Sequence, residues 1–231
     1  METRLLKGML QGLFGPLSIF LLASITTIDV SAITAQEVMD NALEVYENID
    51  NYKAVVQTYQ VPSMAVSPSF LDSQEPIISF NLFFRKPDMH AVEQIGKSRH
   101  GIFRLELLSA LGKLKDKTLE LKKQELIQGQ RCYVLEFTSP DEPDAVIRLW
   151  ISRRNWTVQQ FSLTIKTLAL ATTQFKYPPG GNRRIRFLPI ETRSFFPLSK
   201  KVLINRITNY EVNTKLSSEI FEKRQNKEQS K

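Results

Sequence analysis

The sequence has a single cysteine, Cys132, and only two histidines among its 231 residues. One cysteine cannot form a disulfide within the chain, and so few Cys and His residues cannot make a structural zinc site. No glycine-rich phosphate loop follows a strand pattern, and neither His90 nor His100 has a recognisable catalytic partner nearby. The sequence therefore predicts no metal, no cofactor and no enzymatic activity.

Long hydrophobic runs are also missing, apart from one near the N-terminus. The apolar residues 13–28 follow two basic residues and precede a short stretch of small residues. This order is typical of a secretory signal peptide. We therefore expect residues 1–32 to be a signal peptide, cleaved after Ala32 or Ala35. An uncleaved signal anchor is the alternative. Because no cysteine follows the run, any lipid is expected to be a ligand and not an anchor.

The chain has an excess of positive charge: the formal net charge is +7 and the isoelectric point is about 9.5. A positive field favours anionic partners such as lipid headgroups, nucleic acid or acidic proteins. The basic residues are scattered, however, and no recognition helix or base-stacking motif accompanies them. Nucleic-acid binding is therefore not expected. The length fits one domain over residues 33–222, followed by a flexible polar tail over 223–231.

The first element after the signal segment is predicted to be a helix. Thr34 has the character of an N-cap, and Glu37 lies three residues on, as in a capping box. Apolar residues then recur at helical spacing as far as Ile49. We expect this helix to end near Asp50 and Asn51.

Most of the remaining chain alternates apolar and polar residues with a period of two, which predicts strands. A Pro/Ser loop is expected at Val61–Pro76, and the other connections are short and rich in turn residues. Such a sequence indicates an antiparallel meander of nine or ten strands. The expected strands are Tyr52–Gln60, Ile77–Arg85, Met89–Ile95, Thr118–Ile127, Arg131–Thr138, Val146–Ser152, Trp156–Lys166, Leu168–Tyr177, Phe187–Phe195 and Val202–Glu211.

The segment His100–Lys115 differs from its surroundings, because leucines recur at a spacing of three from Leu105 to Leu114. This predicts an amphipathic helix, the only one after the N-terminal helix. A sheet of so many strands must curl or close, and the two helices would cover its apolar face. The enclosed space is either a packed core or a ligand cavity, and the pattern alone does not separate the two.

Three motifs in this order resemble one known family. They are Leu43, Tyr46, Ile49 and Tyr52 in the first helix and strand, the aromatic-basic-proline turn over residues 82–88, and the segments 207–213 and 216–221 near the end. Together they resemble the periplasmic outer-membrane lipoprotein-sorting (LolA-like) family, over nearly the whole chain after the signal segment.

The resemblance implies a mainly β, α+β fold. This fold is an unclosed antiparallel β-barrel, or strongly curved sheet, with an N-terminal helix and an inserted helix as lid. It also implies a periplasmic, monomeric carrier that binds acyl chains of lipoproteins or other lipids in an apolar cavity. Such carriers receive cargo from an inner-membrane ABC transporter and deliver it to an outer-membrane acceptor.

The same resemblance suggests site residues. Lys86 stands where the family has a functional arginine before the proline of the turn, and His90 stands where the family has an aromatic residue. The apolar residues expected to line the cavity are Phe80, Leu82, Phe84, Met89, Val92, Leu105, Leu108 and Leu111.

Other interpretations remain open. A periplasmic sensor of the same fold would bind a protein partner, and a structural β-domain would have a filled core and no ligand. Trp150 and Trp156 flank a hairpin and are either a membrane-facing or partner-facing tip or ordinary strand aromatics. The basic loop at residues 178–186 is either a contact for anionic groups or a solvated loop.

Overall fold

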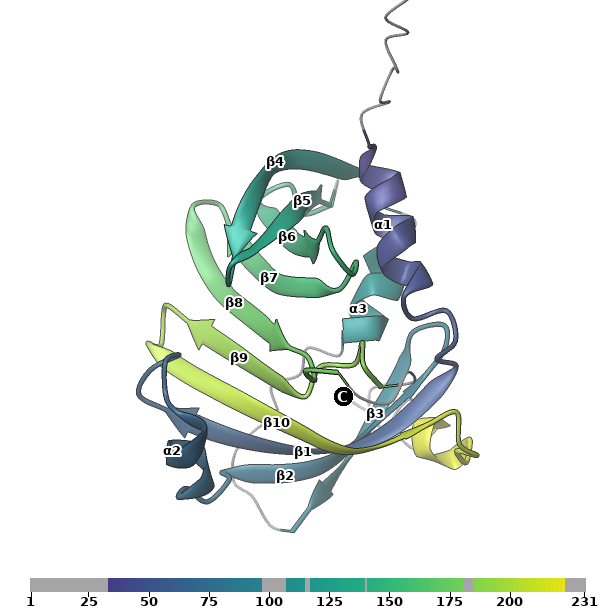
Figure 1. Ribbon diagram of the computed structural model, residues 1–231, viewed down its shortest axis with the longest axis vertical. Coiled ribbons are helices and arrows are strands. Elements are labelled where there is room, and N and C mark those ends of the chain that lie inside the picture. Colours follow the sequence, from purple (N-terminus) through teal and green to yellow (C-terminus); the bar gives the residue numbers. More distant parts are fainter. Residues whose placement is uncertain (1–32, 97–106, 115–116, 140, 181–184, 223–231) are drawn as a thin grey trace, which may run out of the picture. The chain divides into compact units, whose positions relative to one another are not determined.

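The computed structural model describes residues 33–96, 107–114, 117–139, 141–180 and 185–222 (Figure 1). The expected signal peptide at 1–32, the first part of the leucine-rich segment and the polar tail at 223–231 lie outside these ranges. The helices are α1 (Ala35–Glu44), α2 (Pro68–Asp72) and α3 (Leu107–Leu114). The strands are β1 (Asn51–Val61), β2 (Ile78–Arg85), β3 (Met89–Ile95), β4 (Leu119–Ile127), β5 (Gln130–Thr138), β6 (Ala145–Ser152), β7 (Val158–Ile165), β8 (Leu168–Lys176), β9 (Glu191–Phe196) and β10 (Lys201–Val212).

All ten strands form one antiparallel sheet in the order β3-β2-β1-β10-β9-β8-β7-β6-β5-β4. Two runs of hairpins, β1 to β3 and β4 to β10, are joined by the pairing of the first strand with the last. β3 and β4 form the two edges and do not pair with each other, so the sheet is not closed. The expected mainly β, unclosed antiparallel architecture is confirmed.

Helix α1 begins as the sequence predicts. The Thr34 hydroxyl accepts a hydrogen bond from the Glu37 amide at 3.2 Å, and the Glu37 carboxylate accepts one from the Thr34 amide at 2.7 Å. This backbone hydrogen bond from Thr34 is the main reason that the pKa of Glu37 is lowered. The capping box is therefore present.

The end of this helix was predicted wrongly. α1 ends at Glu44, and turns follow instead of a further helical turn. The side chain of Asn213, at the end of the sheet, accepts a hydrogen bond from the Asp50 amide at 2.8 Å and donates one to the Asn48 carbonyl at 2.8 Å. These tertiary hydrogen bonds hold the chain out of helical geometry as it enters β1.

A second difference lies in the Pro/Ser loop at Val61–Pro76, which contains the short helix α2. Ser67 caps this helix by accepting a hydrogen bond from the Phe70 amide at 3.2 Å, and Pro68 occupies its first turn, where proline is well tolerated. The prediction of a single helix after the N-terminal one was therefore wrong. The Ser-Pro pair was the sequence signal for it.

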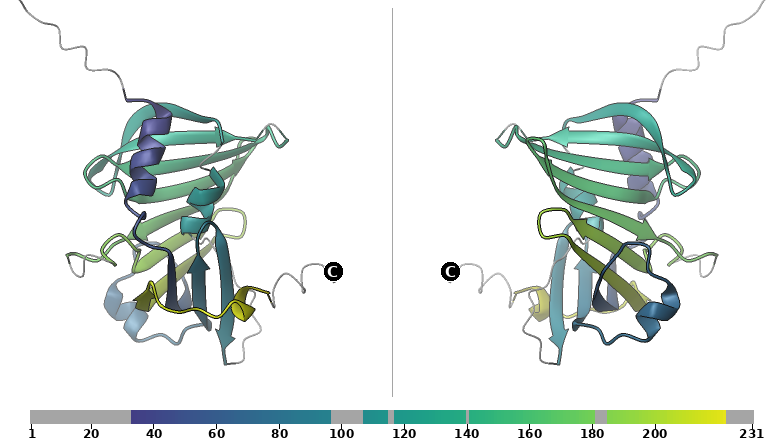
Figure 2. Two further views of the ribbon diagram at one scale, coloured as in Figure 1. Left: turned by 90° about the vertical axis from the view of Figure 1, so that its right-hand side faces the viewer. Right: turned by 90° about the vertical axis from the view of Figure 1, so that its left-hand side faces the viewer.

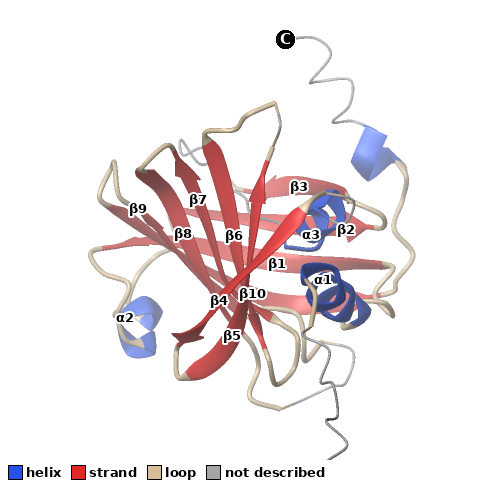
Figure 3. Cartoon of the chain, turned by 90° about the horizontal axis from the view of Figure 1, so that it is seen from above, coloured by secondary structure: helices blue, strands red, loops and turns tan. Residues whose placement is uncertain are grey.

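The inner face of the sheet is the face covered by α1 and α3. Side chains of both helices pack with this face into one large apolar cluster, which includes Met39 of α1, Leu111 of α3 and Leu135 of β5. Figures 1 and 3 show α1 and α3 near each other, with α2 apart from them. The helices therefore cover the inner face, as the amphipathic patterns predict.

The outer face carries smaller apolar clusters. Leu71 of α2 packs against side chains of β1 and β10, and Arg206 donates hydrogen bonds to Asp72 and to the Pro68 carbonyl. The C-terminal segment packs across β2 and β3 through Phe221, which contacts Phe83 and Ala91. Figure 2 shows this segment and α2 from two further sides.

Leu135 offers a test of the inner core, because its side chain is fully buried. Leu135→Ala is expected to lower the free energy of unfolding by about 2–5 kcal/mol, through lost burial and the cavity left behind. Urea denaturation measures this loss. Leu126→Ala is the matched control, since Leu126 is 67% exposed and its truncation should cost less than about 0.5 kcal/mol. Equal losses in the two variants would contradict the assignment of the core.

Candidate functional site

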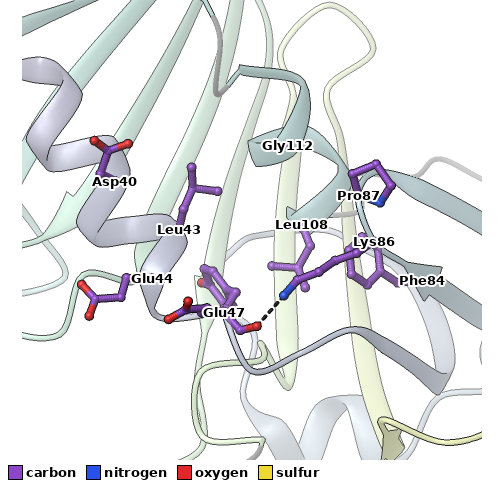
Figure 4. A pocket seen from close by; sticks show the side chains of 10 residues that line it. Asp40, Leu43, Glu44, Glu47, Phe84, Lys86, Pro87, Leu108 and Gly112 are labelled. Carbon is purple, nitrogen blue, oxygen red and sulfur yellow. Dashed lines mark hydrogen bonds between the residues drawn. The ribbon is translucent and has the colours of Figure 1, made fainter.

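The turn between β2 and β3 is bonded to the segment that follows α1. The Lys86 amide donates to the Asp50 carbonyl at 2.8 Å, and the Lys86 ammonium donates to the Glu47 carbonyl (Figure 4). The ammonium also lies 3.6 Å from the Asp50 carboxylate. One lysine therefore connects the hairpin to the chain between α1 and β1.

The same turn is bonded to α3 on its other side. The Ser109 hydroxyl donates to the Asp88 carbonyl at 2.8 Å. A methyl group at Gly112 would lie only 3.0 Å from the Pro87 carbonyl oxygen, so α3 approaches the turn at a distance that favours glycine. The turn at Lys86–Asp88 thus contacts the segments of both covering helices, and we call it the hub turn.

A pocket of about 700 Å³ opens between α1, α3 and the hub turn. Leu43 of α1 and Leu108 of α3 lie on opposite sides of it, and Phe84 of β2 lies near the hub turn (Figure 4). The remaining lining residues are Asp40, Glu44, Tyr46, Glu47, Lys86, Pro87 and Gly112. The volume lies within the range of about 300–1,000 Å³ that is typical of small-molecule sites.

The pocket is amphipathic. Its apolar surface comes from aliphatic and aromatic side chains, whereas carboxylates of α1 and of the turn after it, together with the Lys86 ammonium, supply charge. Asp40, Glu44 and Glu47 are exposed, so these charges remain in contact with water. The arrangement suits a ligand with an apolar part that enters and a polar part that stays outside.

Side chains fill the inner face beyond the pocket. Tyr52 stacks on Phe84 with ring centroids 5.4 Å apart, and Tyr210 packs edge-on against Tyr52. The Tyr177 hydroxyl donates to the Val158 carbonyl at 2.6 Å. Burial raises the pKa of Tyr177 well above its ordinary value, and the neighbouring Tyr46 and Tyr210 raise it further. The pocket is therefore bounded on this side by a packed aromatic layer.

The residues that the sequence predicts for the cavity lie in different places in the structure. Phe84 and Leu108 line the pocket. Phe80, Leu82 and Leu111 are buried in the inner core, with Val92 packed against it. Leu105 lies outside the described residues.

Met89 does not face the pocket. It pairs with Arg85 across the hairpin and packs in the outer-face cluster of Phe83, Ala91 and Phe221. The assignment of Met89 to the inner side was wrong, because strand side chains alternate and the hub turn sets which parity of β3 points inward. His90 is the residue opposite Phe84, on the inner side of β3.

Arg85 and Lys86 have separate roles. The Arg85 guanidinium donates to the Leu216 carbonyl at 2.8 Å and lies 4.5 Å from the centre of the Phe221 ring, on the outer face. Only Lys86 of the two lines the pocket. The residue before the proline of the hub turn is therefore a lysine whose ammonium contacts the segment after α1.

Sequence reasoning missed the contribution of α1 to the pocket. Asp40, Leu43 and Glu44 of α1, with Glu47 of the turn after it, recur at intervals of three and four, beside the buried stripe of the helix. That spacing was the available signal.

The tryptophans do not form a tip. Trp150 is buried, and its indole nitrogen donates to the Glu125 carboxylate at 2.8 Å. Trp156 stacks on Tyr133 with ring centroids 5.6 Å apart. Trp150 is therefore an ordinary strand aromatic, which was one of the two interpretations of the sequence, whereas Trp156 lies in the β6–β7 connection with a positive φ and packs against the inner core.

Among the described residues, no group of three or more His, Cys, Asp or Glu side chains is arranged to hold a metal ion. None of the helices in the described part of the chain is both long enough and apolar enough to cross a membrane.

Among the solved structures that share this fold are three that each match 82% of the chain. A LolA superfamily protein from Nitrosomonas europaea has 17% identity, a TM-score of 0.55 and 98% of its own chain covered. A domain from Vibrio parahaemolyticus, assigned to outer-membrane lipoprotein sorting, has 13% identity, a TM-score of 0.54 and 96% covered. A DUF1329 family protein from Desulfovibrio piger has 13% identity, a TM-score of 0.53 and 98% covered.

No family model matches the sequence, and no curated protein does. At these identities the structural likeness establishes the fold, which is the one that the sequence motifs led us to expect.

Lys86→Ala tests the link between the hub turn and α1. The backbone bond from residue 86 to Asp50 remains, and the lost side chain is 40% exposed, so the free energy of unfolding should fall by less than about 1 kcal/mol. Amide hydrogen exchange at Tyr46 and Ile49 should nevertheless become about two- to five-fold faster. Lys166→Ala removes a similarly loose surface pair and should leave both amides unchanged. Unchanged exchange in Lys86→Ala would show that the link does not order this segment.

Proposed function

We propose that the protein is a periplasmic carrier that binds acyl chains of a lipid or lipidated protein in the pocket between α1 and α3. The observation that carries the proposal is the amphipathic pocket itself. Its apolar side chains Leu43, Phe84 and Leu108 face a space of about 700 Å³, and Lys86 lies beside them.

Burial of hydrocarbon supplies the affinity. Each methylene group removed from water contributes about 0.8 kcal/mol, before the costs of ordering the chain and the protein. An acyl chain of about twelve methylene groups would therefore contribute on the order of 10 kcal/mol before those costs, which leaves a net affinity once they are subtracted. No reactive group is required, since the ligand is held and released unchanged.

The helices that flank the pocket have different attachments, and this bears on how cargo enters. α3 buries its apolar side chains in the core and is bonded to the hub turn through Ser109. The segment after α1 is bonded to the hub turn through Lys86. Small shifts of either helix against the hub turn would widen the pocket without breaking a strand pair. We propose that α1 and α3 act together as the lid.

The route of transfer follows from the proposed location. An exported protein with a signal peptide at residues 1–32 would work between the two membranes, receiving cargo from an inner-membrane ABC transporter and passing it to an outer-membrane acceptor. The fold shared with a lipoprotein-sorting domain supports this route. The chain would act as a monomer.

Leu43→Trp tests the pocket, because Leu43 is only partly buried and a larger ring there fills space without disturbing the core. Binding of a fluorescent fatty-acyl probe or a triacylated lipopeptide should weaken at least about ten-fold. Native mass spectrometry and probe fluorescence measure it. The matched control Leu126→Trp, at an exposed leucine on β4, should bind as the unmodified chain does.

Two results would overturn the proposal. One is a chain that holds no co-purifying lipid and binds neither probe. The other is equal binding by Leu43→Trp and Leu126→Trp. The packed aromatic layer behind Phe84 would then favour a structural β-domain without a ligand.

A further inference from the structure

Large apolar side chains that are exposed gather at one end of the sheet. Within the described ranges, all of them except Leu126 lie at the end where β1 stops and β2 begins. They are Phe70, Ile95, Ile165, Leu168, Phe195 and Leu198. The pocket lies at the other end of β2, beside the hub turn. The exposed residues therefore form no part of the proposed cargo site.

Two neighbouring hairpins carry four of these six side chains, including the two most exposed, Leu198 and Leu168. Ile165 and Leu168 flank the β7–β8 turn, and they are 40% and 49% exposed. Phe195 and Leu198 lie at the β9–β10 turn, and Leu198 is 63% exposed. We call these two turns the hairpin edge.

Strand pairing places the two turns beside each other. Phe195 of β9 pairs with Thr172 of β8, and β8 begins four residues earlier, at Leu168. The β9–β10 turn likewise extends beyond Phe196. Both turns thus project from the same end of adjacent strands. In Figure 1, β9 and β10 join at the left margin, on the side away from α1 and α3.

Lysines accompany the apolar side chains. Lys200 and Lys201 are exposed, and neither forms an ion pair with any residue that the structure describes. Lys166, in the other turn, is 3.9 Å from the Asp144 carboxylate, a loose contact between exposed groups. The whole chain has a net charge of +7. The hairpin edge therefore combines protruding apolar groups with cations that are available to an anionic partner.

We propose that the hairpin edge docks the protein on the surface of a bilayer that contains anionic phospholipid. Apolar side chains on separate projecting turns fit a fluid interface, which accepts each side chain where it enters. Binding of this kind depends on buried apolar area together with attraction of Lys and Arg to anionic headgroups. Aliphatic stems of the lysines can lie along the apolar region while the ammonium groups stay at headgroup level.

The neighbouring connection between β5 and β6 limits the contact. It carries Asp141, Glu142 and Asp144 close to the β7–β8 turn. These carboxylates are repelled by an anionic surface, so the β9–β10 turn enters more deeply than its neighbour. Leu198 is accordingly the side chain expected to lie deepest.

Site-directed fluorescence tests this docking. Leu198→Cys carries an environment-sensitive thiol probe on the full chain, and the native Cys132 does not compete because it is fully buried and burial raises its pKa. With vesicles of phosphatidylcholine and phosphatidylglycerol, the probe emission should shift to the blue. The same probe at Leu126→Cys is the matched control, an equally exposed leucine at the opposite end of the sheet, and should not shift.

The charge requirement has its own test. Lys200→Ala with Lys201→Ala, in the Leu198→Cys chain, should weaken vesicle binding about 25-fold, at about five-fold for each lysine. Raised salt should weaken the binding of the parent chain as well. The emission of the probe depends only on the environment of position 198. If the protein bound vesicles through the N-terminal apolar segment alone, the emission would not shift, and this result would overturn the proposal.

Equal shifts with vesicles of phosphatidylcholine alone would overturn the anionic requirement. An equal shift at positions 126 and 198 would overturn the assignment to the hairpin edge. The outcome does not depend on cargo: Leu43→Trp should dock as the parent chain does, so a failed carrier proposal and a failed docking proposal are distinguishable.

Discussion

The pairing of β1 with β10 is the contact on which the rest of the structure depends. It joins residues about 150 positions apart in the chain and makes one sheet from two runs of hairpins. Closing so long a loop costs conformational entropy that local hairpins do not cost. The side chain of Asn213, directly after β10, also bonds to the segment before β1. These hydrogen bonds fix the chain between α1 and β1, and that segment in turn lies beside the hub turn. The position of the pocket follows from that register.

Most strands could be predicted from the sequence, because their alternation reflects a sheet with one packed inner face. Met89–Ile95 is correct at both ends, and several other strands differ by only one residue. Errors arose where tertiary contacts override local pattern. α1 stops early because Asn213 bonds the chain beyond it, and the first residues of the expected strand at Trp156–Lys166 turn at Trp156, whose φ is positive.

The candidate site was only partly predictable. Phe84, Lys86 and Leu108 follow from motif and periodicity, and each lines the pocket. The wall formed by α1 could not be assigned, because sequence gives the amphipathic face of a helix but not which hairpin it meets. Gly112 shows the same limit. A glycine is favoured there because α3 lies close to Pro87, and this contact depends on the path of the chain from one sheet edge, β3, to the other, β4.

An open barrel leaves two strand edges that could recruit other chains. β4 forms one of them, and charged side chains run along it. Lys122 bonds to Glu120 at 2.7 Å and to Glu136 at 3.2 Å, and Arg148 bonds to Glu136 at 2.6 Å. Partial burial raises the pKa of Glu136, but hydrogen bonds from Arg148 and Lys122 outweigh it, so the net pKa is lowered and this cluster stays ionised. A second copy that stacked on β4 would have to desolvate these charges, which opposes growth of fibrils from the exposed edge and favours a protein that stays dispersed when it is crowded.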